Sequence, residues 1–104
     1  MSVSVYDKFG NLIATGATVQ AVVLANKSKM RNANLCNHDF SNQNLSGTDF
    51  LGALLDYCNF SGSNLSGCDF THASMIGVTF SGSTQFFATV GFNAQNQAYP
   101  GVEF

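Results

Sequence analysis

The sequence predicts an all-β solenoid, in which the chain winds into a coil and turns a corner every five residues. The first observation is a period of five, because every fifth residue from Leu35 to Phe80 is large and apolar. An α-helix repeats every 3.6 residues and a strand every two, so neither produces this period. The second observation is that leucine-type residues and phenylalanine alternate along the series. The series is Leu35, Phe40, Leu45, Phe50, Leu55, Phe60, Leu65, Phe70, Met75 and Phe80.

The alternation indicates four five-residue blocks in each coil, because like residues then stack at intervals of twenty. Each layer would contain two phenylalanines that face each other and two leucine-type residues that face each other. Such an evenly filled core favours four blocks per coil over three. The predicted columns are Phe40, Phe60 and Phe80; Phe50 and Phe70 opposite them; Leu35, Leu55 and Met75; and Leu45 and Leu65.

The residues between the large ones keep the same register. Two residues after each large residue the chain mostly has Gly or Asn, which tolerate a positive φ at a corner. The two positions directly before and after each large residue are mainly Asn, Asp, Ser and Thr, and we expect them to face water. Two residues before each large residue the side chain is mostly small, as a second inward position requires. These residues are Ala33, His38, Gln43, Thr48, Ala53, Cys58, Ser63, Cys68, Ala73 and Val78.

Blocks such as Ala33-Asn34-Leu35-Cys36-Asn37 resemble the A(D/N)LXX motif of the pentapeptide-repeat family. The resemblance covers residues 33–82 without a break. It implies the family fold, a right-handed quadrilateral β-helix, in which ten blocks at four per coil would make two and a half coils.

The flanking segments are predicted to complete a single domain of residues 1–104 around the regular repeats of residues 33–82. Before the repeats, residues 29–31 are expected to begin a degenerate block. After Phe80 the register is expected to fail at Gln85 and to return over residues 88–90.

Residues 1–31 are predicted to form an N-terminal cap made of a β-hairpin and a short helix. Residues 2–6 alternate in polarity, residues 7–10 have the composition of a turn, and the chain then returns. Thr18 can cap a short helix that ends near Ala25, and its valines lie on one face. We expect that face to cover the first coil.

Residues 83–104 are predicted to form a degenerate repeat and a C-terminal cap. The segment is rich in aromatic residues, among them Phe86, Phe87 and Phe92. Two interpretations stay open for them. They form either a hydrophobic plug over the last coil or a homodimer interface, which the resemblance implies because many family members dimerise at this end.

Charged residues are scarce and unevenly distributed along the chain. They make up 10% of the residues, and the net charge is −2. All four cations precede residue 32, whereas residues 32–104 carry five acids and no Lys or Arg. This distribution disfavours direct binding to nucleic acid. No apolar run approaches the length of a membrane span and no signal peptide is apparent, so we expect a cytoplasmic protein without a membrane partner.

The sequence contains no motif for catalysis, a cofactor or a metal. Cys36, Cys58 and Cys68 are odd in number and lack C-x-x-C spacing, which argues against a zinc site. His38 and His72 occupy repeat positions, and no nucleophile elbow, P-loop or G-x-G-x-x-G occurs. We therefore expect a protein that is not an enzyme and binds no cofactor or metal.

Two sets of outward residues are candidate partner-binding sites. The acidic set is Asp39, Asp49, Asp56 and Asp69, of which Asp49 and Asp69 are expected to stack on neighbouring coils. The apolar set is Leu51, Leu54 and Tyr57, which break the rule that outward positions are polar, as Ile76 also does. We expect the apolar set to form a patch around one corner. Either a terminal segment folds back over this patch or a partner binds it.

The resemblance implies a non-catalytic protein that binds another protein. Family members include duplex-DNA mimics that bind DNA gyrase, and the family is common in mobile elements. We therefore predict a small phage or mobile-element inhibitor of a nucleic-acid-handling machine, such as a CRISPR effector, a restriction enzyme or a gyrase. It would act through an acidic and partly DNA-like surface.

The charge of the repeats limits this prediction. B-DNA as tall as the repeats, roughly 12 Å, carries about 7 phosphates. The ten blocks carry four Asp residues, so a full-length mimic is not expected. The alternative is a structural or scaffold module that docks a partner or itself through the apolar patch.

Overall fold

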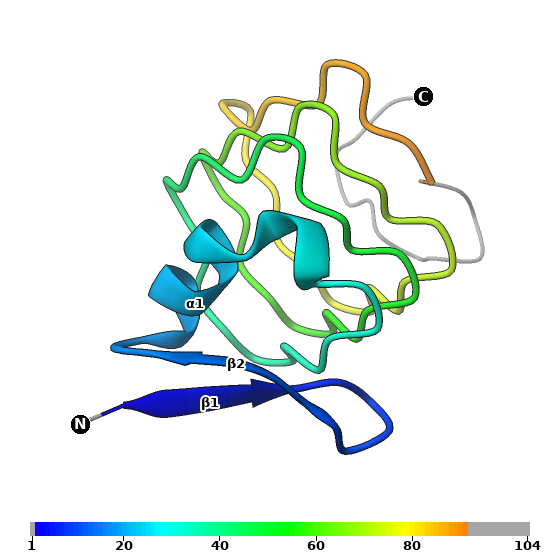
Figure 1. Cartoon of the computed structure of the whole chain (residues 1–104). Coiled ribbons are helices and arrows are strands. Elements are labelled where there is room, and N and C mark those ends of the chain that lie inside the picture. Colours follow the sequence, from blue (N-terminus) through cyan, green and yellow to red (C-terminus); the bar gives the residue numbers. More distant parts are fainter. Residues whose placement is uncertain (1, 92–104) are drawn as a thin grey trace.

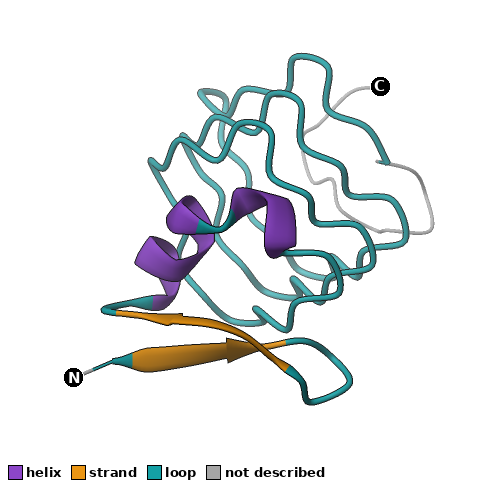
Figure 2. Ribbon diagram, in the orientation of Figure 1, coloured by secondary structure: helices purple, strands orange, loops and turns teal. Residues whose placement is uncertain are grey.

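The computed structural model describes residues 2–91. The chain begins with strands β1 (Val3–Tyr6) and β2 (Leu12–Gly16), which pair as an antiparallel hairpin. Helix α1 (Val19–Ala25) and the 3-10 helix η1 (Lys27–Lys29) follow. From there to residue 91 the chain winds in stacked turns of non-helical backbone, as Figures 1 and 2 show.

The stacked turns repeat every twenty residues, so four five-residue blocks make one coil. Asp39 forms a parallel β-bridge with Asn59, and Asn59 forms the next one with Thr79. The hydrogen bonds follow the same spacing, since the Phe40 N–H donates to the Asn59 carbonyl and the Phe60 N–H donates to the Thr79 carbonyl, each at 2.8 Å. This β-helix-like arrangement is the one that the alternating period predicts.

Side chains at the predicted inward positions fill the coil. The rings of Phe40 and Phe60 stack at 5.6 Å between centroids, and those of Phe50 and Phe70 stack at 5.3 Å. All four are fully buried, and so is Met30. Because the Ala33 N–H bonds to the Met30 carbonyl just as the Ala53 N–H bonds to that of Phe50, Met30 is the inward residue of a block that precedes the regular repeats.

The coil has four sides, which follow one another in chain order. Side 1 is residues 33–35, 53–55 and 73–75; side 2 is 38–40, 58–60 and 78–80; side 3 is 43–45, 63–65 and 84–86; side 4 is 48–50, 68–70 and 89–91. Sides 1 and 3 are opposite each other, as are sides 2 and 4.

The coil continues beyond Phe80 with one inserted residue, which corrects the predicted register. The bridges Asn64 to Gln85 and Asp69 to Val90 span 21 residues instead of 20. Phe86 therefore takes the next inward position, and Val90, predicted to return to the inward series, is 52% exposed. The corner absorbs the extra residue through hydroxyl contacts, in which the Ser81 N–H donates to Thr84 Oγ1 at 3.0 Å.

The N-terminal hairpin and helix form where the sequence predicts them. Thr18 Oγ1 accepts a hydrogen bond from the Ala21 N–H at 3.0 Å, and Val22 and Val23 are buried in the core. The hairpin is joined directly to the coil, because Asp7 forms an antiparallel bridge with Ala33. Figure 1 shows the hairpin and α1 against the first turns of the coil.

Candidate interaction surface

Side 1 and the hairpin together form one continuous row of β-strands. Leu12 is the cross-strand partner of Tyr6 in the hairpin. The Tyr6 carbonyl accepts a hydrogen bond from the Asn34 N–H at 2.9 Å, and Asn34 forms a parallel bridge with Leu54, which in turn bridges to Ser74. Neighbouring strands lie about 4.8 Å apart, so the outward side chains of this row are adjacent.

The outward face of this row is apolar where the repeats elsewhere are polar. Tyr57 is 62% exposed, Leu12 57%, Tyr6 49% and Ile76 46%. Leu51 and Leu54 are half-buried beside them. We call these residues the apolar side. Its members are Tyr6, Leu12, Leu51, Leu54, Tyr57 and Ile76.

The predicted apolar patch has a different shape in the structure. Leu51 lies at the corner that begins side 1, Leu54 lies in its middle, and Tyr57 lies at the corner that ends it. The three residues thus extend along a whole side and do not surround one corner. The Tyr57 N–H donates to the Ile76 carbonyl at 2.7 Å, which places the fourth apolar exception beside Tyr57 on the next coil.

Tyr6 and Leu12 were not among the predicted site residues. The alternation of residues 2–6 indicates a strand but not which strand of the coil it pairs with. A register shift between Val5 and Tyr6 also changes which hairpin residues face outward together. One signal could have identified them: both are large apolar residues at hairpin positions whose side chains point to the face opposite the core.

The four aspartates of the acidic set do not share one face. Asp39 lies on side 2, and Asp49 and Asp69 bridge to each other on side 4, the opposite side. Asp56 lies at the corner between sides 1 and 2. The expected stacking of Asp49 on Asp69 is present, but the other two carboxylates point away from it.

Each of these carboxylates accepts hydrogen bonds from other groups of the coil. Asp39, Asp49 and Asp69 accept hydrogen bonds from the N–H two residues later, at 2.8 to 3.0 Å. Hydrogen bonds from the Ser41 hydroxyl and backbone N–H lower the pKa of the Asp39 carboxyl. Asp56 instead accepts from Ser74 Oγ at 2.6 Å and from the Ile76 N–H at 2.9 Å on the next coil.

The comparisons with known proteins agree with this geometry. The family model for pentapeptide repeats matches residues 26–62 and 53–84, with 8 copies. The chain belongs to the pentapeptide-repeat family. This confirms the resemblance seen in the sequence. No curated protein and no solved structure gives a significant match.

Membership of the pentapeptide-repeat family indicates a non-catalytic protein-interaction module, since the family is generally non-enzymatic. Within residues 2–91 no three His, Cys, Asp or Glu side chains are grouped so that they could hold a metal ion. His38 is half-buried and packs edge-to-face near Phe40, with 6.2 Å between ring centroids, and His72 is exposed at a corner. No helix in the described part is long and apolar enough to cross a bilayer.

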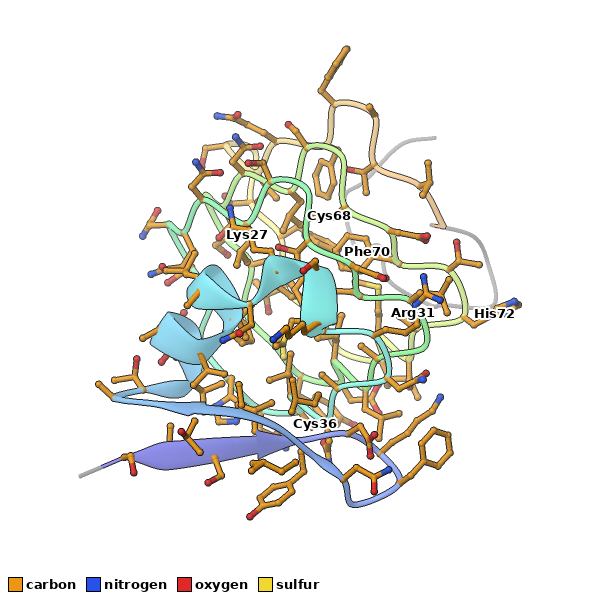
Figure 3. All side chains as sticks on the ribbon, viewed as in Figure 1. Lys27, Arg31, Cys36, Cys68, Phe70 and His72 are labelled. Atoms are coloured by element: carbon orange, nitrogen blue, oxygen red, sulfur yellow. The ribbon has the colours of Figure 1, made fainter. Side chains whose placement is uncertain are left out.

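The cations of this pentapeptide-repeat protein lie close to the start of the coil. Arg31 pairs with Asp49 at 3.1 Å, so one carboxylate of the stacked pair on side 4 is neutralised. Lys8 Nζ donates to the Gly52 carbonyl at 2.9 Å, beside Leu51. Lys27 is the first residue of η1 and Arg31 follows its end; both are labelled in Figure 3.

The three cysteines differ in exposure. Cys36 is half-buried, whereas Cys58 and Cys68 are buried and donate to the carbonyls of Leu35 at 2.9 Å and Leu45 at 3.0 Å. Burial raises the pKa of the Cys58 thiol to about 12 and that of the Cys68 thiol to about 11. Both therefore stay protonated near neutral pH and pack as small side chains.

The aromatic residues near the C-terminus have different surroundings. Phe86 is half-buried and packs edge-to-face against Phe80, with 5.0 Å between ring centroids. Phe87 is 84% exposed at the corner between sides 3 and 4. Phe92 lies outside the described residues. The choice between a plug and a dimer interface at this end stays a prediction.

Proposed function

We propose that this pentapeptide-repeat protein binds a protein partner through its apolar side. The observation that carries the proposal is the exposure of Tyr57, Tyr6 and Leu12 on one continuous row of strands. Exposed aromatic residues in a cluster are typical of binding surfaces, where they supply large contact areas at a small entropic cost. The aliphatic residues between them would form the floor of the contact.

A second candidate function is binding through the acidic surface. The stacked pair of Asp49 and Asp69 on side 4 favours it, because two adjacent carboxylates imitate neighbouring phosphates. In this form the protein would be a phage or mobile-element inhibitor of a nucleic-acid-handling machine, such as a CRISPR effector, a restriction enzyme or a gyrase. We rank it second because Arg31 neutralises Asp49, and because Asp39 faces the opposite side.

We propose further that the coil is right-handed, as in the family, and that the hairpin and α1 form its N-terminal cap. The burial of Val22, Val23 and Met30 in the core next to the first repeats supports the cap. A crystal structure with a left-handed coil, or with α1 displaced from the first coil, would contradict this description.

The docking proposal is tested by site-specific photo-crosslinking. A photoreactive phenylalanine analogue placed at position 57 should capture a partner from the host lysate, and the same analogue at position 87 is the matched control. Phe87 is also an exposed aromatic, but its corner is diagonally opposite that of Tyr57. Equal capture at both positions, or none at position 57, would refute docking through the apolar side.

Ionic strength then separates the two candidates. Contact through the apolar side should persist when salt rises from about 0.1 M to about 0.5 M, whereas binding through carboxylates should weaken steeply. The variant Tyr57→Ser should lose the partner in the first case. The double variant Asp49→Asn and Asp69→Asn should lose it in the second.

A further inference from the structure

We infer that β2 is the dimerisation edge of this protein, and that its occupant is β2 of a second copy in antiparallel orientation. The inference concerns the main-chain edge of β2, whereas the proposed docking uses the outward side chains of the apolar side. It begins from the order of strands on side 1, in which β2 pairs with β1, and β1 pairs with the coil through Asp7 and Ala33. The outer edge of this row is therefore β2.

The main chain of β2 has a free edge. The Asn34 N–H donates to the Tyr6 carbonyl and the Lys8 N–H donates to the Asn32 carbonyl, so the main-chain groups of Tyr6 face the coil. Those of Ser4, two residues earlier, face the same way, because main-chain directions alternate along a strand. Thr15, the partner of Ser4, therefore directs its N–H and carbonyl away from β1. Among the described residues no β-bridge joins β2 to any strand other than β1.

The composition of β2 suits pairing with another strand. Natural edge strands are commonly protected by Lys, by Pro or by an inward-pointing charge. The sequence of β2, LIATG, contains none of these. Its register shift lies at the Leu12 end, so the strand is regular around Thr15, whose N–H and carbonyl are the groups available for pairing.

A second copy fits this edge in charge. A two-fold axis beside β2 pairs this strand with β2 of the second copy. The same surface of both copies then forms the contact, as in most dimers. The strand is uncharged, so like charges do not meet across the contact. The charged turn with Asp7 and Lys8 lies beyond the Leu12 end of β2. In the antiparallel arrangement it lies beside the uncharged Gly16 end of the other copy.

The exposed apolar area supports a weak dimer. Pairing would join the two hairpins into a four-stranded sheet, with Tyr6 and Leu12 of both copies on its outer face. A contact between two five-residue strands buries less than the ~800 Å² per partner of a standard stable interface. We therefore expect a dissociation constant of roughly 10 to 100 µM.

The test compares two lysine substitutions on one cross-strand pair. Thr15→Lys puts a charge on the free edge, whereas Ser4→Lys puts the same charge on β1, on the same face but away from the edge. Both residues are exposed, so both variants should fold, which circular dichroism would verify. Analytical ultracentrifugation of the full chain from about 10 to about 500 µM spans the expected range.

The wild type and Ser4→Lys should dimerise as concentration rises, and Thr15→Lys should weaken the dimer at least about tenfold. A wild type that stays monomeric throughout this range would overturn the inference. So would a dimer that Thr15→Lys leaves intact, in particular one that Phe87→Ser disrupts, since this would place the contact at the other end of the coil. Partner capture at position 57 is a separate readout, so failure of the β2 dimer does not decide it.

Discussion

The ring of Tyr57 lies directly over Gly77, its counterpart one coil further along the chain. A Cβ atom on Gly77 would come within 2.5 Å of Tyr57 Cδ1. Both residues occupy corners with a positive φ, 63° for Tyr57 and 69° for Gly77. A large side chain at one corner is therefore accommodated by the absence of a side chain at the next, and the exposed ring of the apolar side depends on this glycine.

The first prediction concerns Gly77. Gly77→Ala should destabilise the protein by more than the about 1–2 kcal/mol that a left-handed backbone costs an alanine, because the Tyr57 ring must also move. Gly47→Ala is the matched control, since its φ is 74° and no atom lies within 4 Å of the new Cβ. Chemical denaturation of both variants measures the difference.

The contribution of the ring can be separated from that of the backbone. In a Tyr57→Ala background the cost of Gly77→Ala should fall to that of Gly47→Ala, because the clash is then absent. Equal costs of the two alanine substitutions in the wild-type background would show that the Tyr57 ring does not rest on Gly77.

The second prediction concerns the Ser63 hydroxyl, which connects two coils. It donates to the Phe40 carbonyl and accepts from the Gln43 N–H at 3.1 Å, and Ser63 is fully buried. Ser63→Ala leaves both main-chain groups without this partner, so we expect a loss of about 1–3 kcal/mol in the free energy of unfolding. Ser66→Ala is the control, because no hydrogen bond of the Ser66 hydroxyl is present in the described residues. A similar small cost for both would contradict the prediction.

The period of five was sufficient to predict the coil and its core. Large residues at every fifth position cannot all be buried unless the chain turns at each block, and the alternation of Phe with Leu selects four blocks per coil. The stacking of Phe40 on Phe60 follows directly from this count. The separation of Asp39 from Asp49 also follows, because residues ten apart lie on opposite sides of a four-block coil.

The inserted residue and the pairing of the hairpin could not be predicted in the same way. The extra residue near Ser81 is stabilised by hydroxyl contacts within one corner, which leave no periodic signal in the sequence. The position of Tyr6 depends on a main-chain hydrogen bond to Asn34, far along the chain. Such a bond has no side-chain pattern, so the sequence identifies only four of the six members of the apolar side.

The third prediction concerns the pH dependence of stability. Burial raises the pKa of Cys58 to about 12 and of Cys68 to about 11 from the ordinary value of 9.0. In the unfolded chain the thiolates form first, so this contribution is complete below about pH 9 and is lost as the pH rises toward the folded values. At pH 10.5 we expect a loss on the order of 2 kcal/mol for each thiol.

The double variant Cys58→Ala and Cys68→Ala isolates this effect. It should be less stable than the wild type at pH 8, but its stability should fall less steeply up to pH 10.5. Tyrosines and lysines titrate in both proteins, so they cancel in the comparison. Parallel curves of unfolding free energy against pH would contradict the assignment.

The last prediction separates the two roles of Asp49. Its carboxylate pairs with Arg31, whose side chain is 58% exposed, and it also accepts the Leu51 N–H at 3.0 Å. An exposed ion pair contributes about 0–1 kcal/mol, so Arg31→Ala should change stability little, and less still at high salt. Asp49→Ala also removes the acceptor for Leu51 and should cost about 1 kcal/mol more. Thermal unfolding of both variants with and without about 0.5 M NaCl provides the measurement. If Arg31→Ala proves the more damaging change, the ion pair and not the corner hydrogen bond is the main role of Asp49.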